Sequence, residues 1–468
     1  MFMSFVGFFL NKNTMKRILF ISLTLLLSTL CIPAAAQIRN TRDYITIRLI
    51  PNHGDWNYRV SETAEVSLSV ERANCVLPDM TVECEWGPEL RTPDRQWTVQ
   101  TGKKGLQTLT LKGSSQPGFM TLKASISYEG KRYTNYINLA FSPDQILPTT
   151  TLPADFLSFW QTAVNEVRAV PLMTDLAPRS ELNSDQYIAY EVCFQNHKKG
   201  CYLYGLMQIP RNTDGTPLNL SGEKRYPVMI EWPGAGVKSH KGIESVATDE
   251  GYIILEMGVN GISVTQDEAI YRDLKANALS HYWTTGLDNR DTYYYKPIYA
   301  GTVKTVDMLC ALPFIDTTRI VVSGGSQGGA LSLVHAALDS RVKAVSAAYP
   351  ALSEIGGFYH GRVAGWPQIL KDPDEPARAE KAAVAAYYDV VNFARFVSQP
   401  CKLFIGYNDR TCCSTSTFSV WSVLGEKAPT PDKTKKSPAK ELFVVQDCAH
   451  WQYPEHRQAR HRWVLSAE

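Results

Sequence analysis

Ser326 lies in a pattern that is typical of a catalytic nucleophile. It is the centre of the pentapeptide GGSQG (324–328), which follows an apolar segment at 319–323 and precedes an amphipathic helical pattern at 329–338. A G-x-S-x-G sequence between a strand and a helix indicates a nucleophile elbow, in which a strained turn exposes the serine hydroxyl. A phosphate-binding P-loop is excluded because no Gly-Lys-Ser/Thr follows. A plain strand-to-helix turn is the alternative interpretation.

A serine hydroxyl is a weak nucleophile unless an imidazole accepts its proton, and a carboxylate must hold that imidazole in the right tautomer. Asp409 and His450 follow the last two predicted strands of the chain. The order Ser326, Asp409, His450 is the order of serine, acid and histidine in α/β-hydrolases, so we predict a catalytic triad. Asp447, on the same short loop as the histidine, is the rival acid.

Attack on an ester carbonyl also requires N–H groups that stabilise the resulting oxyanion. We assign one to Gln327, because the residue after the nucleophile supplies this donor in hydrolases with an elbow. We assign the second to Ala235, with Gly234 beside it at the substrate, because the segment PGAG (233–236) allows the backbone to approach a ligand closely.

The sequence around these residues predicts that a mostly parallel sheet positions them. Apolar segments such as 226–234, 251–259 and 319–325 alternate with helical patterns. This alternation indicates an α/β fold with helices on both faces of the sheet. Ligands bind beyond the carboxyl ends of such strands, which is where the predicted triad lies. We therefore predict an α/β-hydrolase fold over residues 146–468.

The first part of the chain predicts a different fold. Between residues 45 and 141, short segments alternate apolar and polar residues and are separated by turn residues. This pattern is typical of a small, immunoglobulin-like β-sandwich, which we assign to 37–145. A linker rich in Pro and Thr follows at 142–156. Three tryptophans are either platforms for a carbohydrate or, more simply, core and interface residues: Trp56, Trp86 and Trp97.

The N-terminus predicts export. Lys16 and Arg17 precede an apolar run at 18–32, and small residues at 34–36 provide a cleavage site, so 1–36 is predicted to be a signal peptide. The mature protein is then periplasmic or secreted. A membrane span needs ~20 apolar residues, which neither this run nor any later segment provides, so we expect no stable membrane insertion. A net charge of +2 gives no indication of nucleic-acid binding.

Cysteine and histidine spacing indicates no metal site. No C-x-x-C pair occurs and the histidines are scattered, so we expect neither a metal nor another cofactor. Nine cysteines follow the predicted cleavage site, and the odd number leaves at least one without an intramolecular partner. In an oxidising compartment, Cys448 could pair with Cys412 or Cys413, and Cys193 with Cys201, if their loops lie close together.

Several segments resemble the acetyl xylan esterase and cephalosporin C deacetylase family of α/β-hydrolases: GGSQGG (324–329), YYYKPIYAGTVKTVDML (293–309) and YYDVVNFA (387–394). The resemblance covers about residues 150–468 and leaves the predicted sandwich outside it. Position by position, it implies the same triad and the same oxyanion donors: Ser326, Asp409, His450, Gln327 and Ala235.

Two departures from the family pattern concern the substrate. The family usually has His-Gly-Tyr-Gly where this chain has PGAG, so Ala235 replaces a tyrosine that borders the acyl pocket. It also has Arg-Gly-Gln-Gly where this chain has GVNG (258–261). The family forms ring-shaped hexamers, but the extra N-terminal domain argues against the same ring here and leaves the oligomeric state open.

Two insertions, at 262–295 and 351–381, are predicted to shape the substrate cleft. Both are rich in Tyr, Trp and His, which suits stacking on sugar rings and equally suits packing within a lid. We assign Trp283 and Tyr295 as sugar contacts. The predicted function is a serine carboxylesterase that removes acetyl groups from polysaccharides or oligosaccharides. The alternatives are a feruloyl-type esterase or serine peptidase on the same fold, and a non-catalytic carbohydrate-binding protein.

Overall fold

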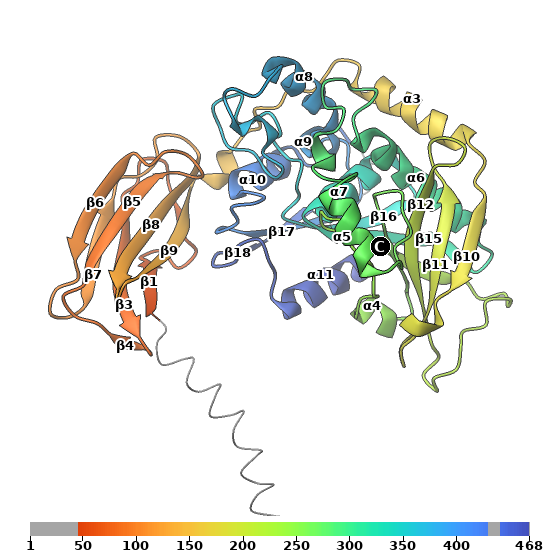
Figure 1. Cartoon of the computed structure of the whole chain (residues 1–468), viewed down its shortest axis with the longest axis horizontal. Coiled ribbons are helices and arrows are strands. Elements are labelled where there is room, and N and C mark those ends of the chain that lie inside the picture. The colour runs from red at the N-terminus through yellow and green to blue at the C-terminus, as the bar shows by residue number, and fades with distance from the viewer. Residues whose placement is uncertain (1–44, 429–439, 468) are drawn as a thin grey trace, which may run out of the picture.

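The computed structural model describes residues 45–428 and 440–467 of the 468-residue chain. The predicted signal peptide at 1–36 lies outside the described residues. An all-β domain, orange in Figure 1, lies beside an α/β domain, and it is next to the blue elements from the C-terminal part of the chain. No helix in the described ranges is long and apolar enough to cross a membrane.

The N-terminal domain consists of two packed β-sheets. Its strands are β1 Ile45–Pro51, β2 Asn57–Tyr58, β3 Ala64–Arg72, β4 Cys75–Val76, β5 Thr81–Pro88, β6 Arg95–Gln100, β7 Leu106–Leu111, β8 Gly118–Tyr128 and β9 Lys131–Phe141. One sheet has the order β1-β3-β4, with β7 also paired to β3, and the other has the order β2-β9-β8-β5-β6. Inward-facing apolar residues of both sheets, such as Val66 on β3 and Leu122 on β8, share one core. The two sheets therefore form a β-sandwich.

The three tryptophans of this domain belong to its core. Trp86 is buried within it, and Trp56 and Trp97 pack against it. This arrangement favours the core interpretation over the interpretation of a sugar platform.

The α/β domain is built on a single nine-stranded sheet in the order β10-β11-β12-β14-β13-β15-β16-β17-β18. Its strands are β10 Thr174–Pro178, β11 Tyr187–Gln195, β12 Tyr202–Pro210, β13 Tyr226–Trp232, β14 Ile253–Met257, β15 Ile315–Gly325, β16 Val342–Ala348, β17 Cys401–Gly406 and β18 Lys440–Val445. The strands β13 to β18 are parallel to one another. The strands β10, β11 and β12 form an antiparallel edge, which joins the parallel part through β14. The predicted mostly parallel sheet is thus confirmed.

Helices cover both faces of this sheet. They are α3 Phe156–Ala169, α4 Val246–Asp249, α5 Glu268–Ala276, α6 Tyr295–Ala311, α7 Gln327–Leu338, α8 Arg378–Tyr388, α9 Val390–Ala394, α10 Ser414–Val423 and α11 Pro454–Ser466. Alternate residues of a strand point to opposite faces. Val228 and Ile230 of β13 join the core under α3, α6, α7 and α9, whereas Met229 joins the core under α4 and α11.

The two domains meet at the end of β17. The ring of Phe119 on β8 lies 5.0 Å from the ring of Tyr407 and 5.6 Å from that of Phe418 on α10. These residues form a small apolar cluster with Ile146 of the linker. The sandwich therefore packs directly on the elements that flank Asp409.

Candidate active site

Ser326 lies on a strained turn between β15 and α7. Its φ of 60° and ψ of −124° are unusual for a residue with a side chain. The turn closes tightly on its neighbours. A Cβ atom at Gly324 would lie 2.4 Å from the carbonyl carbon of Gly328, and one at Gly328 would lie 2.0 Å from the carbonyl oxygen of Trp232. The glycines of the motif are thus required by close backbone contacts, as in a nucleophile elbow.

The structure brings the three residues of the predicted triad together. Nε2 of His450 lies 3.0 Å from Oγ of Ser326, and Nδ1 of His450 lies 2.8 Å from Oδ2 of Asp409. The other oxygen of Asp409 accepts hydrogen bonds from the backbone N–H groups of Thr411 (2.8 Å) and Cys412 (2.9 Å). The Asp409 side chain is fully buried, whereas that of His450 is 28% exposed. The imidazole can therefore accept the serine proton while the carboxylate holds Nδ1–H.

Asp447 does not take the place of the acid. It is exposed, and its carboxylate accepts a hydrogen bond of 3.1 Å from the hydroxyl of Tyr453. The carboxylate that contacts His450 is that of Asp409.

Two further side chains lie against the triad. The ring of Tyr349 lies 4.7 Å from the imidazole ring of His450, and Sγ of Cys412 lies 4.0 Å from Oγ of Ser326. Burial raises the pKa of the Cys412 thiol well above its usual value, so the thiol stays protonated and is a poor nucleophile. The sequence placed Cys412 near the triad, because it follows Asp409 by three residues, but indicated no contact between its thiol and Ser326. Sequence reasoning missed Tyr349, for which the available signal was its position near the end of a predicted strand.

The residues predicted to supply the oxyanion donors lie on neighbouring segments, the start of α7 and the loop after β13. Gln327 is the first residue of α7, so its N–H has no acceptor within the helix. Ala235 is exposed on the loop after β13, and a Cβ atom at its neighbour Gly234 would lie 3.8 Å from the carbonyl oxygen of Gly325. The next N–H on that loop, of Gly236, instead donates to the hydroxyl of Tyr282 at 3.3 Å.

The side chain of Gln327 is held by two tyrosines. Its Oε1 accepts hydrogen bonds from the hydroxyl groups of Tyr282 (2.8 Å) and Tyr295 (2.7 Å). Tyr295 is completely buried, so the prediction that it contacts a sugar is wrong. A tyrosine suits both stacking and burial, and its position in the sequence could not separate the two. Sequence reasoning missed Tyr282, which comes from the insertion at 262–295.

Trp283 joins the two predicted insertions. Its ring is partly buried and lies 5.2 Å from the ring of Trp366, which belongs to the insertion at 351–381. The aromatic residues of the insertions thus pack on each other, and a sugar contact at Trp283 stays a prediction.

The described residues contain neither a disulfide bond nor a cluster of residues that could hold a metal ion. All nine cysteines there are free, so neither of the two suggested pairings is formed. No cluster of three or more His, Cys, Asp or Glu residues with the arrangement of a metal site occurs in this part of the chain.

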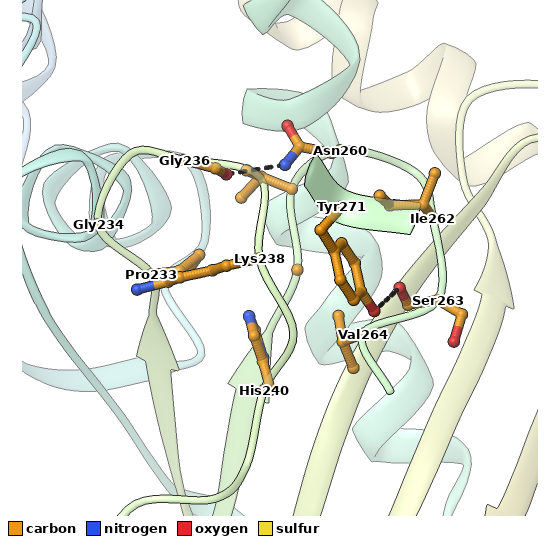
Figure 2. Close-up of a pocket in the computed structure, with 12 residues that line it drawn as sticks. Pro233, Gly234, Gly236, Lys238, His240, Asn260, Ile262, Ser263, Val264 and Tyr271 are labelled. Atoms are coloured by element: carbon orange, nitrogen blue, oxygen red, sulfur yellow. Dashed lines mark hydrogen bonds between the residues drawn. The ribbon is translucent and has the colours of Figure 1, made fainter. Parts of the chain in front are cut away.

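A small cavity is lined in part by Pro233, Gly234 and Gly236, which belong to the loop that carries Ala235 (Figure 2). Nδ2 of Asn260 donates a hydrogen bond of 3.0 Å to the carbonyl oxygen of Gly236 and so fixes this loop. His240, on the floor of the cavity, is buried, and burial lowers its pKa to about 4. Its Nδ1 lies 3.7 Å from a carboxylate oxygen of Glu256. Burial, with a smaller contribution from the Glu231 carboxylate, raises the pKa of Glu256 to about 7.

A groove of about 800 Å³ lies on the other side of Asn260. Tyr202 and Tyr204 of β12 line it with Tyr294, all three half-buried, and Lys198 lies on its rim. The hydroxyl of Tyr294 donates a hydrogen bond of 2.9 Å to Oδ1 of Asn260. Because Asn260 also holds Gly236, the groove adjoins the loop that carries Ala235.

A family model described as acetyl xylan esterase matches residues 144–461. The chain belongs to the acetyl xylan esterase family. It is therefore a carboxylic ester hydrolase of the carbohydrate-esterase type, as predicted from the sequence.

Among the relatives of this acetyl xylan esterase family member, the acetyl esterase Axe7A of Xylanibacter ruminicola is 32% identical over 469 residues. That match covers 97% of this chain and 98% of the relative, so it extends into the sandwich domain. Two solved structures each have a TM-score of 0.57 and 23% identity: acetyl xylan esterase 1 from Thermoanaerobacterium sp. JW/SL YS485 and an acetyl xylan esterase from Paenibacillus sp. R4. They cover 69% and 70% of this chain, and 97% and 98% of their own, which confirms the α/β-hydrolase fold.

Proposed function

We propose that this protein is a serine esterase that removes acetyl groups from oligosaccharides or polysaccharides, with Ser326, His450 and Asp409 as its catalytic residues. The observation that carries the proposal is the continuous hydrogen-bonded path from Ser326 Oγ through both ring nitrogens of His450 to buried Asp409. Family membership supports an acetylated carbohydrate as the substrate.

The reaction has two halves. Oγ of Ser326 bonds to the acetyl carbon while Nε2 of His450 takes its proton, and the N–H groups of Gln327 and Ala235 stabilise the oxyanion. The bond to the sugar oxygen then breaks, and the imidazolium returns the proton to that oxygen, which leaves as a hydroxyl group. Water then gives a proton to His450 and attacks the acetyl carbon of the acetyl-enzyme. The bond between that carbon and Oγ of Ser326 breaks, the imidazolium returns the proton to Oγ, and the acetyl group leaves as acetic acid, which ionises to acetate.

The groove lined by Tyr202, Tyr204 and Tyr294 supports a substrate larger than a simple ester. Its volume of about 800 Å³ is sufficient for several sugar rings. Half-exposed tyrosines offer both a stacking face and a hydroxyl group to a sugar. We assign the carbohydrate chain to this groove and the scissile acetyl group to the loop of Ala235. The signal sequence predicted at 1–36 supports action in the periplasm or outside the cell.

The function is tested by two measurements on the wild-type protein and on Ser326→Ala. A fluorophosphonate probe should label the wild-type protein and leave Ser326→Ala unlabelled. Acetate should be released from acetylated xylo-oligosaccharides, with kcat/KM rising with chain length. Hydrolysis of feruloyl esters or peptides without release of acetate would replace the acetylesterase assignment, and absence of labelling would indicate a carbohydrate-binding protein.

The role of the groove has its own control. Tyr202→Ala should raise KM for long acetylated oligosaccharides and leave kcat/KM for p-nitrophenyl acetate unchanged. Tyr190, a half-buried tyrosine on the neighbouring strand β11, does not line the groove. Tyr190→Ala should affect neither substrate, and an equal effect of both variants would exclude the groove as the sugar site.

A further inference from the structure

Residues 407–415, which run from the end of β17 into the first turn of α10 and include Asp409, are held between the two domains. On the catalytic side, the N–H of Asn408 donates to the carbonyl oxygen of Cys448 at 3.0 Å, next to the loop of His450. On the other side, the segment is bonded to polar side chains of the β-sandwich. These bonds join residues that are 269 to 326 positions apart in the chain.

Glu89, which follows β5, holds the far end of this segment. Its Oε1 accepts a hydrogen bond from the N–H of Ser414 (3.1 Å), and its Oε2 accepts from the N–H (3.2 Å) and hydroxyl (2.7 Å) of Thr415. These N–H groups open α10 and have no acceptors within the helix. The N-cap residue Cys413 makes no side-chain capping bond. The cap of α10 is thus supplied by the other domain, and a carboxylate there is favoured by the helix dipole.

Asn138 on β9 holds the near end. Its Nδ2 donates to the carbonyl oxygen of Tyr407 (2.7 Å), and its backbone N–H donates to Oδ1 of Asn408 (2.9 Å). The hydroxyl of Tyr136 donates to the carbonyl oxygen of Asn408 at 3.1 Å. Asn138 is 1% exposed. The two residues directly before Asp409 are therefore fixed by β9.

The acid lies between these two anchors. Its carboxylate must keep one oxygen 2.8 Å from His450 while the other is bonded to Thr411 and Cys412. Catalytic geometry tolerates little error, since a displacement of about 1 Å can cost on the order of 100-fold in rate. Both ends of the segment that sets this position are bonded to the sandwich and not to the α/β sheet alone.

We propose that the N-terminal sandwich is an integral part of the active site, and that Glu89 and Asn138 are positioning residues that hold Asp409 against His450. This inference rests on the proposed function, because the position of Asp409 matters only if it serves the imidazole. The same bonds also join the domains, so the test must separate positioning of the acid from adhesion between domains.

The variants are Asn138→Ala and Glu89→Gln in the full chain. Asn138→Ala removes the donor to Tyr407, and Glu89→Gln places an NH₂ group against N–H donors. The matched control is Glu71→Gln on β3, where a buried sandwich carboxylate is bonded to Arg48 within the same domain. Each variant is first shown to be folded by circular dichroism.

Activity is measured with p-nitrophenyl acetate in the wild-type and in the Asp409→Asn backgrounds. We expect kcat to fall about tenfold or more in Asn138→Ala and Glu89→Gln with little change in KM. The same substitutions should change kcat less than about twofold when Asp409 is already Asn, because both act through the acid. Glu71→Gln should resemble the wild type in both backgrounds.

A measurement without substrate separates this inference from the proposed function. The proton on Nδ1 of His450, bonded to Asp409, gives a strongly deshielded proton NMR signal. That signal should weaken or shift in Asn138→Ala and Glu89→Gln and persist in Glu71→Gln. The positioning role would be overturned if the folded variants kept both the signal and the wild-type kcat. It would also be overturned if their losses of kcat multiplied with the loss caused by Asp409→Asn. A wild-type protein that shows the signal but releases no acetate would instead overturn the proposed function.

Discussion

The hydroxyl of Tyr282 lies 2.8 Å from Oε1 of Gln327 and donates a hydrogen bond to it. The hydroxyl oxygen of Tyr282 in turn accepts a hydrogen bond of 3.3 Å from the N–H of Gly236. One tyrosine from an insertion thus ties together the start of α7 and the loop after β13. These two segments carry the proposed oxyanion donors Gln327 and Ala235, so Tyr282 sets the distance between them.

Tyr282→Phe should lower kcat for p-nitrophenyl acetate about tenfold and change KM little. The variant leaves Gly236 N–H without its acceptor and Gln327 with one donor, and misplaced oxyanion donors weaken binding of the transition state. Tyr271→Phe is the control, because its hydroxyl bonds to Ser263 in the same insertion. Equal kcat values in both variants would contradict this role for Tyr282.

The triad predicts how far kcat falls when each of its residues is replaced. Ser326→Ala or His450→Ala should lower kcat on the order of 10⁴-fold or more without unfolding the protein. Asp409→Asn should also be severe, because the imidazole loses its orienting carboxylate. Asp447→Asn should remain near wild-type activity, since its carboxylate bonds to Tyr453. Near-normal activity of Asp409→Asn with an inactive Asp447→Asn would reverse the assignment.

The small side chain of Ala235, where the family usually has a tyrosine, leads to a prediction about acyl specificity. We expect acetate esters to be the best substrates, with propionate and butyrate esters tolerated better than in relatives that have a tyrosine at this position. One methylene group is worth only about 1–3 kcal/mol of discrimination. Ala235→Tyr should sharpen the preference for acetate. The measurement is kcat/KM on a p-nitrophenyl ester series, and a steady rise from acetate to octanoate would contradict the acetylesterase assignment.

The buried Glu256 predicts a dependence of stability on pH. Its pKa rises from 4.5 to about 7 in the folded protein. Between these values the folded state binds more protons than the unfolded state, so this carboxyl group lowers the free energy of unfolding as pH increases. Glu256→Gln lacks this contribution, so its stability relative to the wild type should increase from pH 5 to pH 8, by about 2.5 kcal/mol.

Urea unfolding of both proteins at pH 5 and pH 8 measures this difference. His240 and Glu231 face Glu256, but both proteins contain them, so their contributions largely cancel. A difference in stability that is the same at both pH values would contradict a raised pKa at Glu256.

The triad was predictable because each of its residues follows a strand, and the ends of parallel strands converge at one edge of a sheet. The fold was predictable from the change in periodicity near residue 150. The contacts of Tyr282 and Tyr295 with Gln327 were not predictable, because an irregular insertion has no sequence period from which burial can be inferred. The bonds of Glu89 and Asn138 to the acid segment were also beyond prediction. They depend on how two domains dock, and no local pattern records a contact across 270 residues.

The catalytic residues are synthesised late, because Ser326, Asp409 and His450 all follow the sandwich in the sequence. The sandwich and the nucleophile Ser326 are complete long before Asp409 and His450 have been made. Domains fold as units from the N-terminus, so the acid segment emerges to find Glu89 and Asn138 already in place. A chain that stops before residue 409 carries a serine with neither base nor acid. A product that ends before His450 therefore lacks the triad and should have no esterase activity.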